Sequence, residues 1–242
     1  MIKCVLFDFW GTLVDFGGEK SVERIRMERA QKFMDELRNY GYSFSYEKVW
    51  NTLELVRIKC TQIRDTTYKE ISAREVTGMT LKELNVHSSK VYNKCAKIYS
   101  DVILSMELSL FEGAVEVLKW LKENRFKIGL LSNTEHGTVE RSLLDRFGIR
   151  GYFDLIIFSC DVGVRKPSPE IFKYALNRLV VSPTESVYVG DWPEVDILGA
   201  KHAEMRTIYL KSGDEPYPEE VPLPDATIKR LTEIRKVLAT KF

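Results

Sequence analysis

Strands and helices are expected to alternate along the second half of this 242-residue chain, and this alternation limits the fold more than any other feature. From residue 108 onward, short apolar runs typical of buried strands are separated by amphipathic segments typical of helices. The predicted strands span 127–131, 155–158, 187–189, 207–210 and 226–228, and the predicted helices span 113–123, 139–147, 168–179, 195–203 and 231–239. Because a helix can carry the chain back between two parallel strands, the pattern predicts an α/β fold with a doubly wound, Rossmann-like parallel sheet.

A first strand is predicted at the N-terminus, where the apolar residues 4–7 precede Asp8 and a glycine. Residues 14–18 are expected to form a turn. Helices are then predicted at 21–40, 46–63 and 88–104, with one or two more between 66 and 85. We therefore predict a core of residues 1–16 and 106–242, with a helical domain of residues 17–105 inserted into it.

Composition and charge exclude several classes of protein. Apolar residues make up 44% of the chain and charged residues 29%, which is typical of a globular protein. No apolar run approaches the roughly 18 residues that span a bilayer, and the N-terminus enters a strand without the apolar region of a signal peptide. The formal net charge of +1 gives no electrostatic reason to expect nucleic acid or an anionic membrane as a partner. We therefore expect a cytoplasmic protein that acts on a small molecule.

Polar residues follow the predicted strands, at the edge where open parallel sheets bind ligands. They are Asp8, Thr12, Ser132, Asn133, Lys166, Asp191 and Asp196. Each has an ordinary explanation by itself, as a turn former, a solvated charge or a helix cap, but together they suit displacement at phosphorus. A carboxylate such as Asp8 can attack a phosphoryl group, Ser132 can donate hydrogen bonds to its oxygens, and Lys166 can neutralise the charge that develops. The substrate is then a small anion.

A magnesium ion is expected between Asp8 and the acids Asp191 and Asp196. Mg²⁺ prefers few carboxylates together with water and substrate oxygens, and two acids five positions apart can serve it, one directly and one through water. The three histidines and four cysteines are scattered along the chain, so a zinc site is not expected.

Four segments of the chain resemble the four motifs of the haloacid dehalogenase superfamily. They are Asp8-Phe9-Trp10-Gly11-Thr12-Leu13, Leu131-Ser132-Asn133-Thr134, Lys166-Pro167-Ser168-Pro169-Glu170-Ile171-Phe172, and Gly190-Asp191 followed by Asp196-Ile197-Leu198-Gly199-Ala200. Their order and spacing match across the whole predicted core. By resemblance, residues 17–105 look like the helical cap that closes over the core in that superfamily.

The resemblance also implies a role for each residue at the sheet edge. Asp8 is the implied nucleophile and Lys166 the lysine that stabilises charge. Thr12 and Ser132 are implied to hold the phosphate or its equivalent, and Asn133 is a further candidate for this task. Asp191 and Asp196 are the implied acid pair of the metal site, with Asp196 acting through water.

Trp10 departs from the phosphatases of this superfamily, which normally carry a second aspartate two residues after the nucleophile as general acid and base. An indole cannot exchange a proton near neutral pH. An aromatic residue at this position resembles the 2-haloacid dehalogenase branch, but dehalogenases need no metal and typically have serine where this chain has Asp191. The phosphonate-cleaving branch keeps Mg²⁺ with a backbone carbonyl as ligand, so the carbonyl of Trp10 is a candidate ligand here.

These features leave several functions open. The favoured one is a Mg²⁺-dependent phosphatase of a small phosphorylated metabolite, of sugar or triose phosphate type, with an aspartyl-phosphate intermediate on Asp8. The alternatives are a metal-independent 2-haloacid dehalogenase with an aspartyl-ester intermediate, a phosphonate hydrolase, and a binding protein without catalysis. Glu135 and His136 are weaker candidates for proton transfer, and Arg57, Arg64 and Lys69 for contacts with an anionic leaving group; solvated helix faces are the ordinary explanation for all five.

Overall fold

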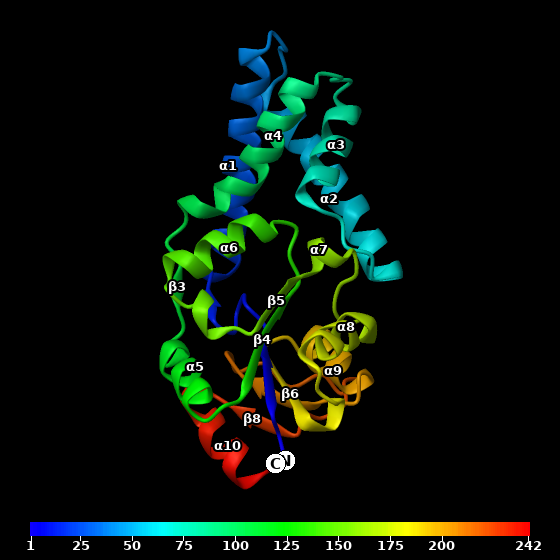
Figure 1. Ribbon diagram of the computed structural model, residues 1–242. Helices are drawn as coiled ribbons and strands as arrows, with labels where there is room; N and C mark the ends of the chain where they lie inside the picture. The colour runs from blue at the N-terminus through cyan, green and yellow to red at the C-terminus, as the bar shows by residue number, and fades with distance from the viewer.

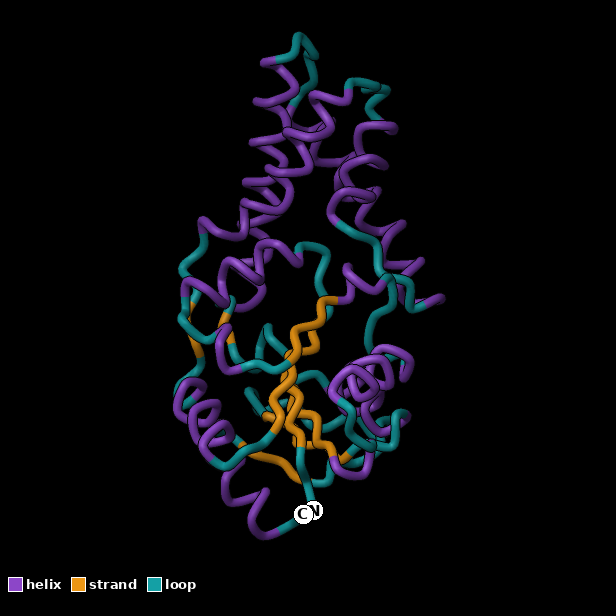
Figure 2. The backbone as a smooth tube through the Cα atoms, in the orientation of Figure 1, coloured by secondary structure: helices purple, strands orange, loops and turns teal.

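The computed structural model describes the backbone of residues 1–242 and the side chains of residues 1–17 and 20–242. It consists of two units stacked end to end, an α/β unit that contains both termini and a purely helical unit (Figure 1, Figure 2). Below they are called the sheet unit and the helical unit. Among the described residues, no helix is long and apolar enough to cross a membrane.

The sheet unit is built on six parallel strands in the order β5-β4-β1-β6-β7-β8. Their bounds are Cys4–Phe7 (β1), Lys127–Ser132 (β4), Leu155–Phe158 (β5), Ser186–Gly190 (β6), Arg206–Leu210 (β7) and Ala226–Ile228 (β8). The order runs outward in both directions from β1, which confirms the predicted doubly wound sheet. Phe7 lies beside Leu130 of β4 and Val189 of β6, so the chain leaves these three strands at the same edge.

Helices cover both faces of this sheet because residues along β1 alternate between the two faces. Val5 and Phe7 pack into a cluster with α5 (Ala114–Glu123), α6 (Gly137–Arg146) and α10 (Ile234–Thr240). Cys4 and Leu6 pack into a second cluster with α8 (Pro169–Leu179) and α9 (Leu198–His202). Every residue of β1 is fully buried, as the apolar run predicted.

The helical unit has a hydrophobic cluster of its own, formed by side chains such as Phe33, Val56 and Val91. Its helices are α1 (Gly18–Asn39), α2 (Tyr46–Thr67), α3 (Ala73–Glu83) and α4 (Ser89–Asp101), and the 3₁₀ turn η1 (Val102–Ser105) follows them. Serine side chains cap the N-termini of α2, α3 and α4.

The residues between 14 and 18 do not form only a turn, as predicted. Val14 and Asp15 form β2 (Val14–Asp15), which pairs antiparallel with β3 (Ser109–Leu110). The chain therefore leaves the sheet unit and returns to it through one small two-stranded sheet. This pairing joins segments almost a hundred residues apart, so no local pattern could indicate it.

Other elements differ from prediction in detail. The segment predicted as one helix at 195–203 begins as a π-helical turn, η4 (Pro193–Ile197), before α9. The final helix begins with the 3₁₀ turn η5 (Leu231–Glu233), and the short helix α7 (Ser159–Val162) was not predicted. Two further 3₁₀ turns are η2 (Arg150–Tyr152) and η3 (Pro183–Glu185). At α8 the predicted start is confirmed, because the Ser168 side chain accepts a hydrogen bond from the amide of Glu170 and Pro169 is the first helical residue.

Candidate active site

Asp8 lies directly after β1, at the middle of the sheet edge. Its amide donates a hydrogen bond to the carbonyl oxygen of Val189 on β6 (3.0 Å), so strand pairing fixes its position. The chain then turns at Gly11, whose φ of +76° is in the left-handed region that favours glycine. A Cβ atom at Gly11 would lie 2.2 Å from Asp191 Oδ2, so glycine is what allows this turn to approach the second acid.

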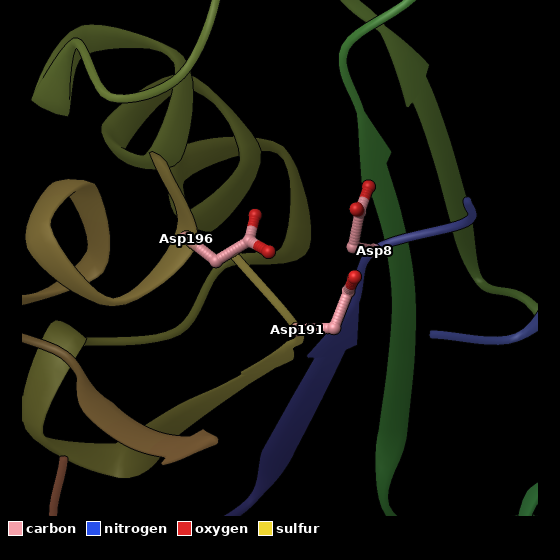
Figure 3. A group of neighbouring side chains, drawn as sticks. All are labelled: Asp8, Asp191 and Asp196. Atoms are coloured by element: carbon pink, nitrogen blue, oxygen red, sulfur yellow. The ribbon is translucent and has the colours of Figure 1, made fainter. Parts of the chain in front are cut away.

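Three carboxylates meet at this edge although they come from separate segments. Asp8 follows β1, Asp191 follows β6, and Asp196 lies in η4; one oxygen of each lies within 4.8 Å of the others (Figure 3). Asp196 Oδ2 accepts a hydrogen bond from the amide of Trp192 (3.0 Å), which turns this side chain back toward the end of β6. A Cβ atom at Gly190 would lie 2.4 Å from Asp196 Cγ, so glycine leaves room for that carboxylate.

Lys166 is buried against two of these acids. Its Nζ lies 2.9 Å from Asp8 Oδ1 and 2.6 Å from Asp196 Oδ1. It also donates a hydrogen bond to the hydroxyl of Tyr188 (2.7 Å), which in turn donates to the carbonyl oxygen of Leu131 (2.7 Å). The ammonium group is thus held in one place with only 1% of the residue exposed.

Asn133 holds the backbone of Lys166. Its Nδ2 donates to the Lys166 carbonyl oxygen and its Oδ1 accepts from the Lys166 amide, both at 2.9 Å. Both polar atoms of the Asn133 side chain therefore have partners in the protein. This geometry favours a positioning role for Asn133 over the phosphate contact that the sequence suggested.

Thr12 and Ser132 differ in what they contact. Thr12 Oγ1 donates a hydrogen bond to Asp191 Oδ1 (2.8 Å), so it orients one of the acids. Ser132 Oγ is buried, and it has no hydrogen-bond partner in the part of the chain that the structure describes. A buried hydroxyl without a partner is costly, and a ligand oxygen at the sheet edge would satisfy it.

The electrostatics of the cluster favour a cation. Burial, together with the charges of the neighbouring Asp196 and Asp8, raises the pKa of Asp191 to about 8. Burial also raises the pKa of Asp196 to about 6, although Lys166 partly offsets this. Burial by itself lowers the pKa of Lys166, but Asp196 and Asp8 outweigh it and hold that pKa above its usual value. One lysine does not neutralise three acids, and a hard divalent cation is what such an oxygen set binds.

A family model described as haloacid dehalogenase-like hydrolase matches residues 2–204. The chain belongs to this family of hydrolases. It is 28% identical over 235 residues to the glyceraldehyde 3-phosphate phosphatase of Methanocaldococcus jannaschii, covering 97% of this chain and 96% of that one. The hydrolase is also similar to the crystal structure of a 2-haloacid dehalogenase from Pseudomonas syringae (25% identity, TM-score 0.75) and to that of a HAD phosphatase from Thermococcus onnurineus (26% identity, TM-score 0.66), with 99% of both chains covered in each case. The resemblance seen in the four motifs is confirmed at the level of the family.

Trp10 of this hydrolase is held by a residue that sequence reasoning missed. Its indole Nε1 donates a hydrogen bond to Glu140 Oε1 (3.3 Å), and its ring packs edge-on against Phe9 and Phe16. Glu140 lies in α6 and is fully buried. A signal was present, because helical spacing places residue 140 on the same stripe as the apolar residues 139, 143 and 144. An acid on a buried helical stripe indicates a specific partner.

Glu135 and His136 lie where the helical unit meets the sheet unit. Glu135 pairs with Arg64 of α2 (2.7 Å) and accepts a hydrogen bond from the Tyr99 hydroxyl (2.9 Å). His136 Nδ1 lies 3.3 Å from Ser100 Oγ, and burial lowers the pKa of His136 to about 4. A neutral imidazole at this junction cannot serve as a general acid at neutral pH.

The remaining basic candidates of the helical unit are also paired. Arg64 is buried between Glu135 and Glu70. Arg57 is half exposed and pairs with Glu54 of its own helix (2.9 Å), and exposed Lys69 lies 3.9 Å from Glu75.

Proposed function

We propose that this hydrolase is a phosphatase of a small phosphorylated metabolite, of sugar or triose phosphate type. The observation that carries the proposal is the cluster of Asp8, Asp191 and Asp196, which has more negative charge than Lys166 can neutralise. A reaction that uses a carboxylate nucleophile on an anionic substrate without a metal would gain nothing from Asp191, because an ionised Asp191 would repel both. The similarity to a glyceraldehyde 3-phosphate phosphatase supports the same reaction class.

The residues present fit a magnesium ion. Asp8 and Asp191 would bind it directly together with the backbone carbonyl of Trp10, and Asp196 would bind it through water. The donors are all oxygens, as Mg²⁺ prefers, and the raised pKa of Asp191 reflects the repulsion between buried carboxylates that a bound cation would relieve. When bound, the ion would withdraw electron density from the phosphoryl oxygens and reduce the electrostatic repulsion between Asp8 and the anionic substrate.

The side chains of the protein would carry the chemical steps. An oxygen of Asp8 forms a bond to phosphorus while the bond from phosphorus to the leaving oxygen breaks, and water then attacks the aspartyl phosphate to release inorganic phosphate and free Asp8. Ser132 Oγ would donate to a phosphoryl oxygen, and Lys166 would orient Asp8 and neutralise charge that develops at the phosphoryl group. Because Trp10 offers no acidic proton, the leaving oxygen takes its proton from water.

We also propose that residues 17–105 form a cap over this site and that residues 1–16 and 106–242 form the catalytic core. The end of α2 and the loop after it support this arrangement. The amide of Glu70 donates to the carbonyl oxygen of Gly163 (3.0 Å), and the amide of Arg165, next to Lys166, donates to the carbonyl oxygen of Tyr68 (2.9 Å). In this arrangement, residues of the helical unit would contact the part of a small anionic substrate that leaves.

A metal titration tests the proposal. The protein is freed of metal with a chelator and assayed with a panel of sugar and triose phosphates over a range of Mg²⁺ concentrations. Phosphate release is expected to require Mg²⁺ and to be lost in Asp8→Asn and Asp191→Asn. The matched control is Asp214→Asn, an exposed acid outside the site, which should behave as the unaltered protein. Phosphate release that is unchanged by chelator would overturn the metal assignment.

A second candidate is the 2-haloacid dehalogenase reaction, which the aromatic Trp10 and the similarity to the Pseudomonas syringae structure favour. In this case Asp8 displaces halide from carbon and water cleaves the resulting ester. Release of chloride from 2-chloropropionate without added metal, with no phosphate ester hydrolysed, would select this reaction instead.

A further inference from the structure

Glu140 contacts two of the loops that carry candidate site residues. Its Oε1 accepts a hydrogen bond from Trp10 Nε1, two residues after Asp8, and another from Thr134 Oγ1, two residues after Ser132. These two donors follow β1 and β4, and the acceptor lies in α6. One carboxylate oxygen of Glu140 therefore links the loop that carries Asp8 to the loop that carries Ser132.

Keeping an acid at this position is costly. Glu140 is fully buried, and its Oε2 has no hydrogen-bond partner within the described part of the chain. Burial accordingly raises the pKa of Glu140 to about 7. An apolar residue would pack beside Val139, Leu143 and Leu144 without this cost. What the carboxyl group contributes is thus its pair of hydrogen bonds to the two loops.

The indole of Trp10 has an apolar cavity on one side and Glu140 as its hydrogen-bond partner. Its ring borders an apolar cavity of about 220 Å³ lined by Phe16, Val22, Ile25, Ile103 and Met106. These side chains are apolar, and the thioether of Met106 is at most a weak acceptor, so this side offers the indole N–H no partner comparable to a carboxylate. The bond to Glu140 therefore supplies the indole N–H with the strong acceptor that the cavity side lacks.

We propose that Glu140 is a positioning residue that sets the spacing between the Asp8 loop and the Ser132 loop by holding Trp10 and Thr134 on one oxygen. The inference rests on Asp8 as the nucleophile, as proposed above, and applies whether Asp8 attacks phosphorus or carbon. Displacing one loop against the other would spoil the approach of Asp8 to a substrate that Ser132 holds, and misplacement by about 1 Å can cost ~10²-fold in rate. Loss of the anchor should therefore lower kcat more than it changes KM.

Three substitutions separate this role from simple packing. Glu140→Leu removes the acceptor, Glu140→Gln keeps one acceptor oxygen, and Trp10→Phe removes the indole N–H while keeping an aromatic ring. We expect Glu140→Leu to lower kcat by roughly 10- to 100-fold with KM changed less than about threefold, and Glu140→Gln to retain kcat within about threefold. Trp10→Phe removes only the Trp10 bond and leaves Thr134 on Glu140, so it should lower kcat, but by no more than Glu140→Leu does. The double variant should be no worse than Glu140→Leu, because that substitution already removes the Trp10 bond.

Tryptophan emission provides a readout that does not depend on turnover. The difference between the spectra of the unaltered protein and Trp10→Phe gives the emission of Trp10. This emission should shift in Glu140→Leu and stay in place in Glu140→Gln. The matched control is Trp120→Phe, which removes a tryptophan of α5 away from the sheet edge and should leave kcat unchanged.

Each outcome bears on the proposal. Glu140→Leu with unchanged kcat and unchanged Trp10 emission would overturn it, as would additive losses in the double variant. If Glu140→Leu does not fold, Trp10→Phe and Glu140→Gln decide: equal kcat in Trp10→Phe and the unaltered protein overturns the proposal. If the unaltered protein hydrolyses no substrate, the proposed function fails, and the Trp10 emission alone then decides whether Glu140 holds the indole.

Discussion

Acidification is expected to destabilise the folded chain through His136. This residue is 8% exposed, and its Nδ1 lies 3.3 Å from Ser100 Oγ of the helical unit. Its pKa falls from 6.5 to about 4, chiefly because burial disfavours the charged form, and Arg29 and Arg64 add to this while Glu135 opposes it. The folded state therefore keeps His136 neutral under conditions in which the unfolded chain protonates it.

The sign and size follow from linkage between protonation and folding. Because the folded pKa is the lower one, the stabilisation is complete above the unfolded pKa of 6.5 and is lost as the pH falls toward the folded pKa of about 4. Between about pH 7.5 and about pH 5, His136 becomes protonated in the unfolded state but stays largely neutral in the folded state. This difference lowers the free energy of unfolding by about 2 kcal/mol. Most of this cost should appear below about pH 6.5.

Urea unfolding of the full chain and of His136→Gln at both pH values measures this effect. Glutamine is of similar size, can contact Ser100, and does not titrate. Asp191 and Asp196 have raised pKa values in the folded protein, so their protonation stabilises the fold on acidification and opposes the effect of His136. Both proteins contain these acids, so the difference between the two proteins isolates His136. The unaltered protein should lose about 2 kcal/mol more than His136→Gln over this range. An equal loss in the two proteins would refute the reasoning.

Three further outcomes are expected at the sheet edge. Asp8→Asn should lower turnover by about 10⁴-fold or more, and mass spectrometry should find no covalent adduct on the variant after it is mixed with substrate. Lys166→Met should lower kcat by roughly 10³-fold. Its free energy of unfolding should also fall as the pH rises from about 5 to about 8, because the neighbouring acids then ionise without a cation beside them. A free energy of unfolding that does not change with pH would contradict this. Gly11→Ala should raise the Mg²⁺ concentration needed for half-maximal activity, because its Cβ would lie 2.2 Å from Asp191 Oδ2. The control Gly41→Ala has a similar φ of +84° with nothing within 4 Å, so it should cost only about 1 kcal/mol of backbone strain and leave the Mg²⁺ requirement unchanged.

Local patterns predicted the elements of the sheet well. The strands at 155–158 and 226–228 have the predicted bounds, and the helix that begins after Ser168 has the predicted cap. These features depend on side-chain periodicity and on capping within a few residues, which the sequence displays directly. The π-helical turn at 193–197 depends instead on where Asp196 finds its partners, Lys166 and the amide of Trp192, so a pattern of helical spacing could not reveal it.

The sequence by itself determined which chemical groups arrive at the carboxyl edge of the sheet, because Asp8, Ser132 and Asp191 stand at the ends of apolar strands and Lys166 lies a short way beyond one. Asp8, Ser132, Lys166 and Asp191 needed no contact map to be chosen as candidates. Only the tertiary structure decided how these groups are partnered: Asn133 holds the backbone of Lys166, Thr12 orients Asp191, and Trp10 points its N–H at Glu140, 130 positions away. Such contacts depend on how α6 and the loops pack against the sheet, and packing joins residues that no local pattern relates.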